Sequence, residues 1–210
     1  MARLLHICAS PRSDEESYSR RVAKVFVDAY QQTHAADSIE TLDLARVRVP
    51  EFGPLALAAR HRIMEGGALR PREARTWRAI EDAIARFKRA DKLVISSPMW
   101  NFGIPYRLKQ YFDVIVQPRL TFAYSPESGY TGLVTGRPAM LILARGGEYS
   151  EGGPTITWDF QRTYLETILG FIGFTDIRKI IVEPTLQGHE LGAQKLAAAQ
   201  ALARELAAQF

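Results

Sequence analysis

One stretch decides how this chain folds, and it reads Lys92-Leu93-Val94-Ile95-Ser96-Ser97-Pro98-Met99-Trp100-Asn101-Phe102-Gly103-Ile104-Pro105-Tyr106-Arg107-Leu108-Lys109-Gln110-Tyr111-Phe112-Asp113. Its apolar first part, residues 92–97, predicts a buried strand, and a helical pattern begins at Pro105. The loop between them is unusually apolar, with a methionine, a tryptophan and a phenylalanine beside an asparagine. Ligands bind at the carboxyl ends of strands in open α/β sheets. We therefore expect a flat apolar surface with a hydrogen-bonding rim, suited to a planar heteroaromatic ligand.

Apolar runs and helical patterns alternate along the rest of the chain. The other four predicted strands are residues 4–9, 39–42, 139–143 and 177–182. Apolar spacing predicts helices that include residues 22–29, 55–64, 71–87, 105–116 and 191–209, and one more that begins near residue 158 and stops at Gly170 or Gly173. Residues 120–134 predict a long loop or a short hairpin. Five such alternations indicate a parallel sheet with helices on both faces, joined by right-handed crossovers.

Length and composition place the chain among ordinary globular proteins. Its 210 residues are 47% hydrophobic and 24% charged, which suffices for one sizeable core, and we expect one domain over residues 1–210. The net charge is +4, with basic residues scattered rather than clustered, so we expect no nucleic-acid partner. No apolar segment reaches the ~18 residues of a membrane span. The single cysteine, Cys8, excludes an intrachain disulfide and fits a reducing cytoplasm.

Three predicted strands end in loops whose residues could bind a ligand. Ser10 follows the first strand and begins a hydroxyl-rich loop that leads into a helix, where backbone amides and the helix dipole favour an anion. Arg12 could add charge there. Arg145-Gly146-Gly147 follows the fourth strand, and glycines allow close backbone approach to a ligand. In a doubly wound sheet of strand order 2-1-3-4-5, these loops meet the Pro98 loop. Together they suggest a phosphate site, a ring platform and a ring-edge contact, as for flavin mononucleotide (FMN).

Each loop also has a structural explanation: a polar helix cap, core filler and a plain turn. Other chemistry finds less support. The four histidines lack metal-ligand spacing, and no nucleophile elbow or dinucleotide glycine motif is present. We therefore predict no metal and no catalytic acid, base or nucleophile, which favours a cofactor that carries the chemistry.

Longer motifs resemble those of a known family, the FMN-dependent NADH azoreductases, also described as NADH:quinone oxidoreductases. The resemblance covers nearly the whole chain. It rests on residues 98–105 and 108–113 and on the following further segments: residues 121–124, 132–136, 145–147, 153–154, 169–173 and 175–176.

The resemblance implies a fold, a cofactor and a site. The fold would be α/β, a flavodoxin-like three-layer αβα sandwich with a five-stranded parallel sheet of order 2-1-3-4-5. FMN would bind noncovalently. Its phosphate would lie against Ser10, Ser17, Tyr18 and Ser19. Its ribityl chain and ring would contact Pro98, Met99, Trp100, Asn101 and Phe102. Its ring edge would face Ala144, Arg145, Gly146 and Gly147.

The resemblance also implies an activity. NADH or NADPH would reduce the flavin, and a quinone or azo compound would then accept two electrons in a ping-pong cycle. The family is homodimeric, with flavin sites at the subunit interface, where Phe122, Tyr124, Tyr130 and Phe171 could wall the open face. The chain departs from the family at residues 11–16, at Trp100, where tyrosine is usual, and at Ala144, where a hydroxyl residue is common.

Two other classes of protein stay open at this point. A flavodoxin-type electron carrier would share the fold but is typically acidic, whereas the isoelectric point here is about 9.3. A flavin-free interaction protein could also have kept the fold, and it would be colourless when purified.

Overall fold

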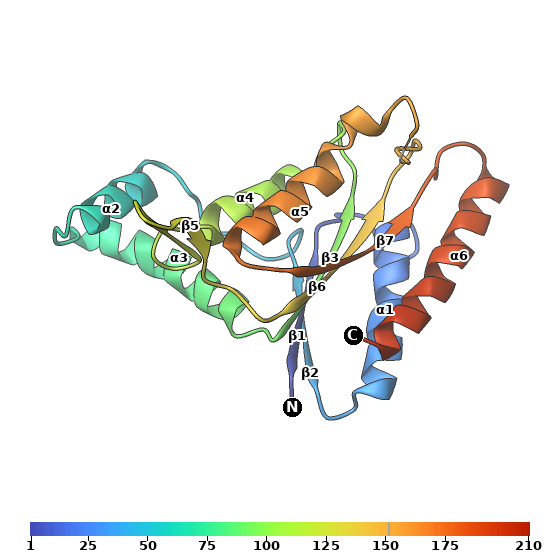
Figure 1. Cartoon of the computed structure of the whole chain (residues 1–210), viewed down its shortest axis with the longest axis horizontal. Helices are drawn as coiled ribbons and strands as arrows, with labels where there is room; N and C mark the ends of the chain where they lie inside the picture. Colours follow the sequence, from blue (N-terminus) through green and yellow to red (C-terminus); the bar gives the residue numbers. More distant parts are fainter. Residues whose placement is uncertain (151) are drawn as a thin grey trace.

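The computed structural model describes residues 1–150 and 152–210 and is organised around one five-stranded parallel sheet (Figure 1). The sheet order is β2-β1-β3-β6-β7. Its strands are β1 (Arg3–Cys8), β2 (Ser38–Asp43), β3 (Lys92–Pro98), β6 (Pro138–Ala144) and β7 (Asp176–Val182). Without the two hairpin strands, this order is the predicted 2-1-3-4-5, and the predicted flavodoxin-like α/β arrangement is confirmed.

Six α-helices and one short 3₁₀ helix accompany the sheet in the described chain. The helices are α1 (Tyr18–Thr33), α2 (Pro54–Met64), α3 (Pro71–Lys88), α4 (Tyr106–Ile115), η1 (Ile156–Trp158), α5 (Phe160–Ile172) and α6 (His189–Ala208). Helices α1 and α6 lie side by side on one face, with α3, α4 and α5 on the other (Figure 1). The proline at the first position of α3 and the glycine after α5 mark the helix ends expected from sequence.

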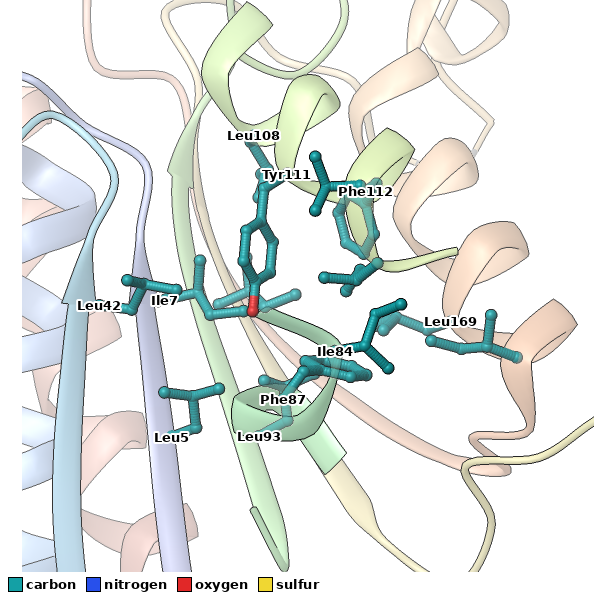
Figure 2. Packing of buried hydrophobic residues seen from close by; sticks show 14 of the residues in the cluster. Leu5, Ile7, Leu42, Ile84, Phe87, Leu93, Leu108, Tyr111, Phe112 and Leu169 are labelled. Carbon is teal, nitrogen blue, oxygen red and sulfur yellow. The ribbon is translucent and has the colours of Figure 1, made fainter. Parts of the chain in front are cut away.

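The sheet divides the core into two because successive strand residues point to opposite faces. Leu4 and Val94 face α1 and α6, whereas Leu5, Leu93 and Ile95 face the other layer. Figure 2 shows that second layer, where ten labelled side chains meet: Leu5, Ile7, Leu42, Ile84, Phe87, Leu93, Leu108, Tyr111, Phe112 and Leu169. Both faces of the central strands are therefore buried, which explains their continuous apolar runs.

Residues 120–134, predicted to be a long loop or a short hairpin, form a hairpin. Strands β4 (Phe122–Ser125) and β5 (Gly129–Gly132) pair antiparallel. The hairpin packs closely on the end of α5, because Gly132 has the backbone of Ile172 and Gly173 so near that a Cβ would lie 2.3–2.5 Å from it. This contact brings Phe122 and Tyr130 against the ring of Phe171.

Two helical predictions were wrong in detail. Trp158 was expected in the apolar face of the helix before Gly170, but it lies in η1 and is 51% exposed. The apolar spacing of Leu196, Ala199, Leu202 and Leu206 predicts one buried face of the last helix, but the buried face runs through Ala199, Ala203 and Ala207, and Leu202 is 38% exposed. Small alanines let α6 pack close to its neighbours, which turns Leu202 outward.

Candidate functional site

A cavity of about 280 Å³ lies where the carboxyl ends of β1, β3 and β6 meet. It is lined by Ser10, Pro11, Arg12, Glu16, Ser17, Tyr18, Pro98, Met99, Trp100, Ala144, Gly146, Thr185 and Leu186. Hydroxyl groups come from the β1 loop, whereas the apolar and aromatic surface comes from the β3 loop. The three loops predicted from sequence therefore meet at one place, and the donor set fits a phosphorylated, planar aromatic ligand.

The β1 loop brings hydroxyls to the start of α1. Ser17 is the N-cap of this helix, and its side chain accepts a hydrogen bond from the backbone amide of Arg20. The first amides of a helix have no intrahelical acceptor, so an anion can bind there. Ser19 does not line the cavity. Its side chain is fully buried, and its hydroxyl lies 3.3 Å from that of Ser17, so Ser19 supports the cap from behind.

Arg20 braces this loop against the sheet. Its guanidinium pairs with Asp14 in the loop at 2.5 Å and with Asp43 at the end of β2 at 3.0 Å. It also donates to the carbonyl of Ser10 at 3.1 Å and to the thiol of Cys8 at 2.9 Å. Burial raises the pKa of the Cys8 thiol, which keeps this cysteine protonated and structural.

The β3 loop is a tight turn with an unusual backbone. Trp100 and Gly103 exchange two backbone hydrogen bonds, of 3.0 and 2.9 Å, around Asn101 and Phe102. Both central residues have positive φ, +46° and +68°, as in a type I′ turn. Asparagine tolerates this region, but a bulky phenylalanine rarely adopts it. Such strain is typical of functional loops.

This turn presents Met99 and Trp100 to the cavity and turns Asn101 and Phe102 away from its lining. Phe102 is 43% exposed, and its ring makes an edge contact with Trp158 at 5.5 Å between centroids. A second edge contact, with Tyr149 at 6.4 Å, ties the turn to the β6 loop.

In the β6 loop, the backbone faces the cavity and the arginine side chain does not. Ala144 and Gly146 line the cavity, but the side chain of Arg145 is buried beneath the loop. Its guanidinium lies 2.9 Å from Asp159 and 3.2 Å from Glu183. Gly147 lies outside the lining, under the ring of Tyr149.

Sequence reasoning missed a fourth wall, at Thr185 and Leu186 after β7. The amide of Leu186 donates to the carbonyl of Gly146 at 3.1 Å, and the hydroxyl of Thr185 donates to that of Arg145 at 2.9 Å. These bonds hold the β7 loop against the β6 loop. The only signal in the sequence was that this segment follows the strand next to β6.

A larger hollow, of about 590 Å³, lies between α2 and α3 and is lined by Arg48, Glu51, Leu55, Thr76 and neighbouring residues. Its lining residues come from the β2–α2 loop, α2 and α3, and none belongs to the loops after β1, β3, β6 or β7. We assign the ligand site to the smaller cavity, because four loops of different chemistry converge there.

Other chemistry has little basis in the residues that the structure describes. No cluster of three or more histidine, cysteine or acidic side chains there could hold a metal ion. His6 is buried in β1 with its Nε2 2.8 Å from the hydroxyl of Ser96, and burial, with nearby Arg20, lowers its pKa to about 4. Within residues 1–150 and 152–210, no helix is long and apolar enough to cross a bilayer.

Comparison with known proteins shows the family to which this chain belongs. A family model for the flavodoxin-like fold matches residues 2–207. An FMN-dependent NADH:quinone oxidoreductase of Nitratidesulfovibrio vulgaris is 51% identical, with both chains covered completely. One of the same name from Desulfotalea psychrophila is 46% identical over 98% of each chain. The chain belongs to the flavodoxin-like family that includes these oxidoreductases. The family resemblance seen in the sequence is thereby confirmed.

Solved structures agree with this membership. The crystal structure of an azoreductase from Bacillus anthracis superimposes with a TM-score of 0.93 at 29% identity, over the whole of both chains. An FMN-dependent NADH-azoreductase of the same species, in complex with FMN, gives a TM-score of 0.90 at 28% identity and covers 99% of this chain. These names favour an enzyme over a plain electron carrier for this family member.

Proposed function

We propose that this chain is an FMN-dependent oxidoreductase that takes a hydride from NADH or NADPH and reduces quinones or azo compounds. One observation carries the proposal: hydroxyl groups, an aromatic wall and a glycine backbone, from three different strand ends, line one cavity in a member of this family. The chain is one functional unit over residues 1–210 in this proposal.

The residues of the cavity have distinct tasks. Ser10, Ser17 and Tyr18 would bind the phosphate of FMN, together with the first amides of α1. Met99 and Trp100 would lie along the ribityl chain and ring. When bound, FMN supplies the two-electron hydride chemistry that the side chains lack. The backbone at Gly146 would approach the ring edge and stabilise negative charge there.

Of the remaining predicted contacts, five act indirectly in this proposal. Ser19 supports Ser17, and Arg145 supports the β6 loop. Asn101 and Phe102 shape the turn that presents Trp100. The backbone of Gly147 packs against the ring of Tyr149.

Donor and acceptor would use the same open side of the cavity in turn. NADH or NADPH would give up a hydride and leave as NAD⁺ or NADP⁺, and the acceptor would then take two electrons with protons from solvent. In this proposal the order is ping-pong, with the oxidised nucleotide leaving before the acceptor binds.

We also propose a homodimer with the cavities at its interface. Tyr124 and Tyr130 on the hairpin are 64% and 66% exposed, and they form a ring cluster with Phe122 and Phe171. An exposed aromatic cluster of this kind suits the wall of a partner's site. The cytoplasmic location expected from the single cysteine stays a prediction.

The absorption spectrum of the purified protein tests the cofactor. We expect flavin bands that bleach on addition of NADH or NADPH and return when a quinone is added. Steady consumption of NADH with a quinone separates an enzyme from an electron carrier, which would show almost none. A colourless protein that takes up no FMN would refute the proposal.

A further inference from the structure

Two opposite charges line the phosphate end of the cavity. Arg12 and Glu16 both belong to the loop between Ser10 and Ser17, and both are lining residues. An arginine there is expected for a phosphate ligand. A carboxylate is not, because it repels a phosphate dianion.

Neither of these two side chains is paired with another charged group in the described chain. Another charged side chain of this loop, Asp14, pairs with Arg20 at 2.5 Å. Across the described chain, Arg12 and Glu16 take part in no ion pair, and their only hydrogen bonds come from their backbone amides, to Ser10 and Ser13. Both side chains are exposed. They are therefore free to respond to a charged ligand.

We infer that Arg12 and Glu16 act in opposition on the phosphate of the bound cofactor and together set how tightly FMN is held. This inference rests on the proposed FMN site. Arg12 attracts the phosphate dianion, whereas Glu16 repels it. The neutral hydroxyls of Ser10 and Ser17 and the amides of α1 fix the position of the phosphate, and the balance of the two charges tunes its affinity.

The matched ligand pair is FMN and riboflavin, which differ only in the phosphate. We expect Arg12→Gln to weaken FMN binding about tenfold and Glu16→Gln to strengthen it by a similar factor, with riboflavin affinity unchanged in both. Arg21→Gln and Glu15→Gln are matched controls, because these neighbouring exposed residues lie outside the cavity lining. Dissociation constants come from quenching of flavin fluorescence by protein freed of flavin.

Salt and pH provide a second measurement. The second ionisation of a phosphate monoester lies near pH 6, so FMN affinity should rise between about pH 5 and pH 7.5 as the dianion forms. This rise should be smaller in Arg12→Gln and larger in Glu16→Gln. Salt should reduce the effect of both variants, because the two side chains are exposed.

Each outcome has a separate meaning. If Arg12→Gln binds FMN as tightly as the Arg21→Gln control does, the inference is wrong while the FMN site stands. If Arg12→Gln weakens riboflavin and FMN equally, the loop acts through its shape, and the inference is again wrong. If the unaltered protein binds neither flavin, the proposed function itself fails.

Discussion

The guanidinium of Arg145 lies 2.9 Å from the carboxylate of Asp159, and both side chains are almost completely buried, at 1% and 0% exposure. Asp159 is also the N-cap of α5, where it accepts a hydrogen bond from the backbone amide of Arg162. The pair thus joins the β6 loop, which lines the cavity, to the start of the helix that follows it.

Removal of the Arg145 charge should strongly destabilise the fold. Arg145→Met leaves the buried Asp159 and the largely buried Glu183 without their shared cation, and the expected loss is about 3–5 kcal/mol in the free energy of unfolding. Urea unfolding followed by circular dichroism measures it. Arg75→Met, on an exposed position of α3, should change little. A loss below about 1 kcal/mol for Arg145→Met would show that the cluster contributes little.

A double-mutant cycle tests whether the two residues act together. Arg145→Met combined with Asp159→Asn should destabilise by less than the sum of the single variants, because either single change already breaks the ion pair between these two residues. Simple additivity would contradict direct coupling.

His6 should make stability fall in mild acid. Burial, with Arg20, lowers its pKa in the folded protein to about 4, below the ~6.5 of the unfolded chain. The neutral ring is therefore favoured by folding: its contribution is fully present above about pH 6.5 and is lost as the pH falls toward 4. The difference corresponds to about 3 kcal/mol.

The variant His6→Gln isolates this contribution, because glutamine stays neutral and can still bond to Ser96. Urea unfolding between pH 7 and pH 4 should show a shallower decline in the variant than in the unaltered protein. Parallel declines would mean that His6 does not titrate as proposed.

Replacement of Tyr111 by phenylalanine should stabilise the folded protein. Its ring packs in the core (Figure 2), but its buried hydroxyl has no hydrogen-bond partner in the described structure. An unsatisfied buried hydroxyl costs about 1–3 kcal/mol, so Tyr111→Phe should raise the melting temperature. Tyr164→Phe is the control, since Tyr164 is only half-buried, and it should be nearly neutral. A lower melting temperature for Tyr111→Phe would reveal a partner such as a bound water.

Gly132 should tolerate no side chain. A Cβ there would lie 2.3 Å from the backbone nitrogen of Gly173, and backbone cannot move aside as a flexible side chain can. Gly132→Ala should push the hairpin from α5 and destabilise by about 1–3 kcal/mol in thermal or urea unfolding. Gly170→Ala, in the neighbouring helix with open space around it, should instead stabilise by about 0.5–1 kcal/mol. Equal effects at the two positions would contradict the close contact.

The sequence predicted helices and strands best where a local apolar pattern is compatible with only one secondary structure. Trp77, Ile80, Ile84 and Phe87 recur at helical spacing, and all four are buried on one face of α3. Residues 93–97 are buried throughout, because both faces of β3 are covered. Alternation of such segments leaves a parallel sheet as the only way to bury them, and the convergence of the three loops follows from its strand order.

The sequence could not predict which side chains of these loops face the cavity. Ser17 and Ser19 are chemically alike, yet one caps α1 at the cavity and the other is buried behind it. Arg145 belongs to a predicted ligand loop, but partners 14 and 38 residues further along the chain draw its guanidinium inward. Thr185 and Leu186 carry no motif at all.

The sequence by itself therefore determined the order of elements, the two-sided burial of the central strands and which loops lie at their carboxyl ends, because these depend on local periodicity and on the handedness of crossovers. Only the tertiary structure decided which atoms of those loops face the cavity. That choice depends on long-range partners, as Arg145 with Asp159 and Arg20 with Asp43 show, and on close backbone contacts such as Gly132 on Gly173. The exposed charges of Arg12 and Glu16 remain at the cavity because no such partner draws them away.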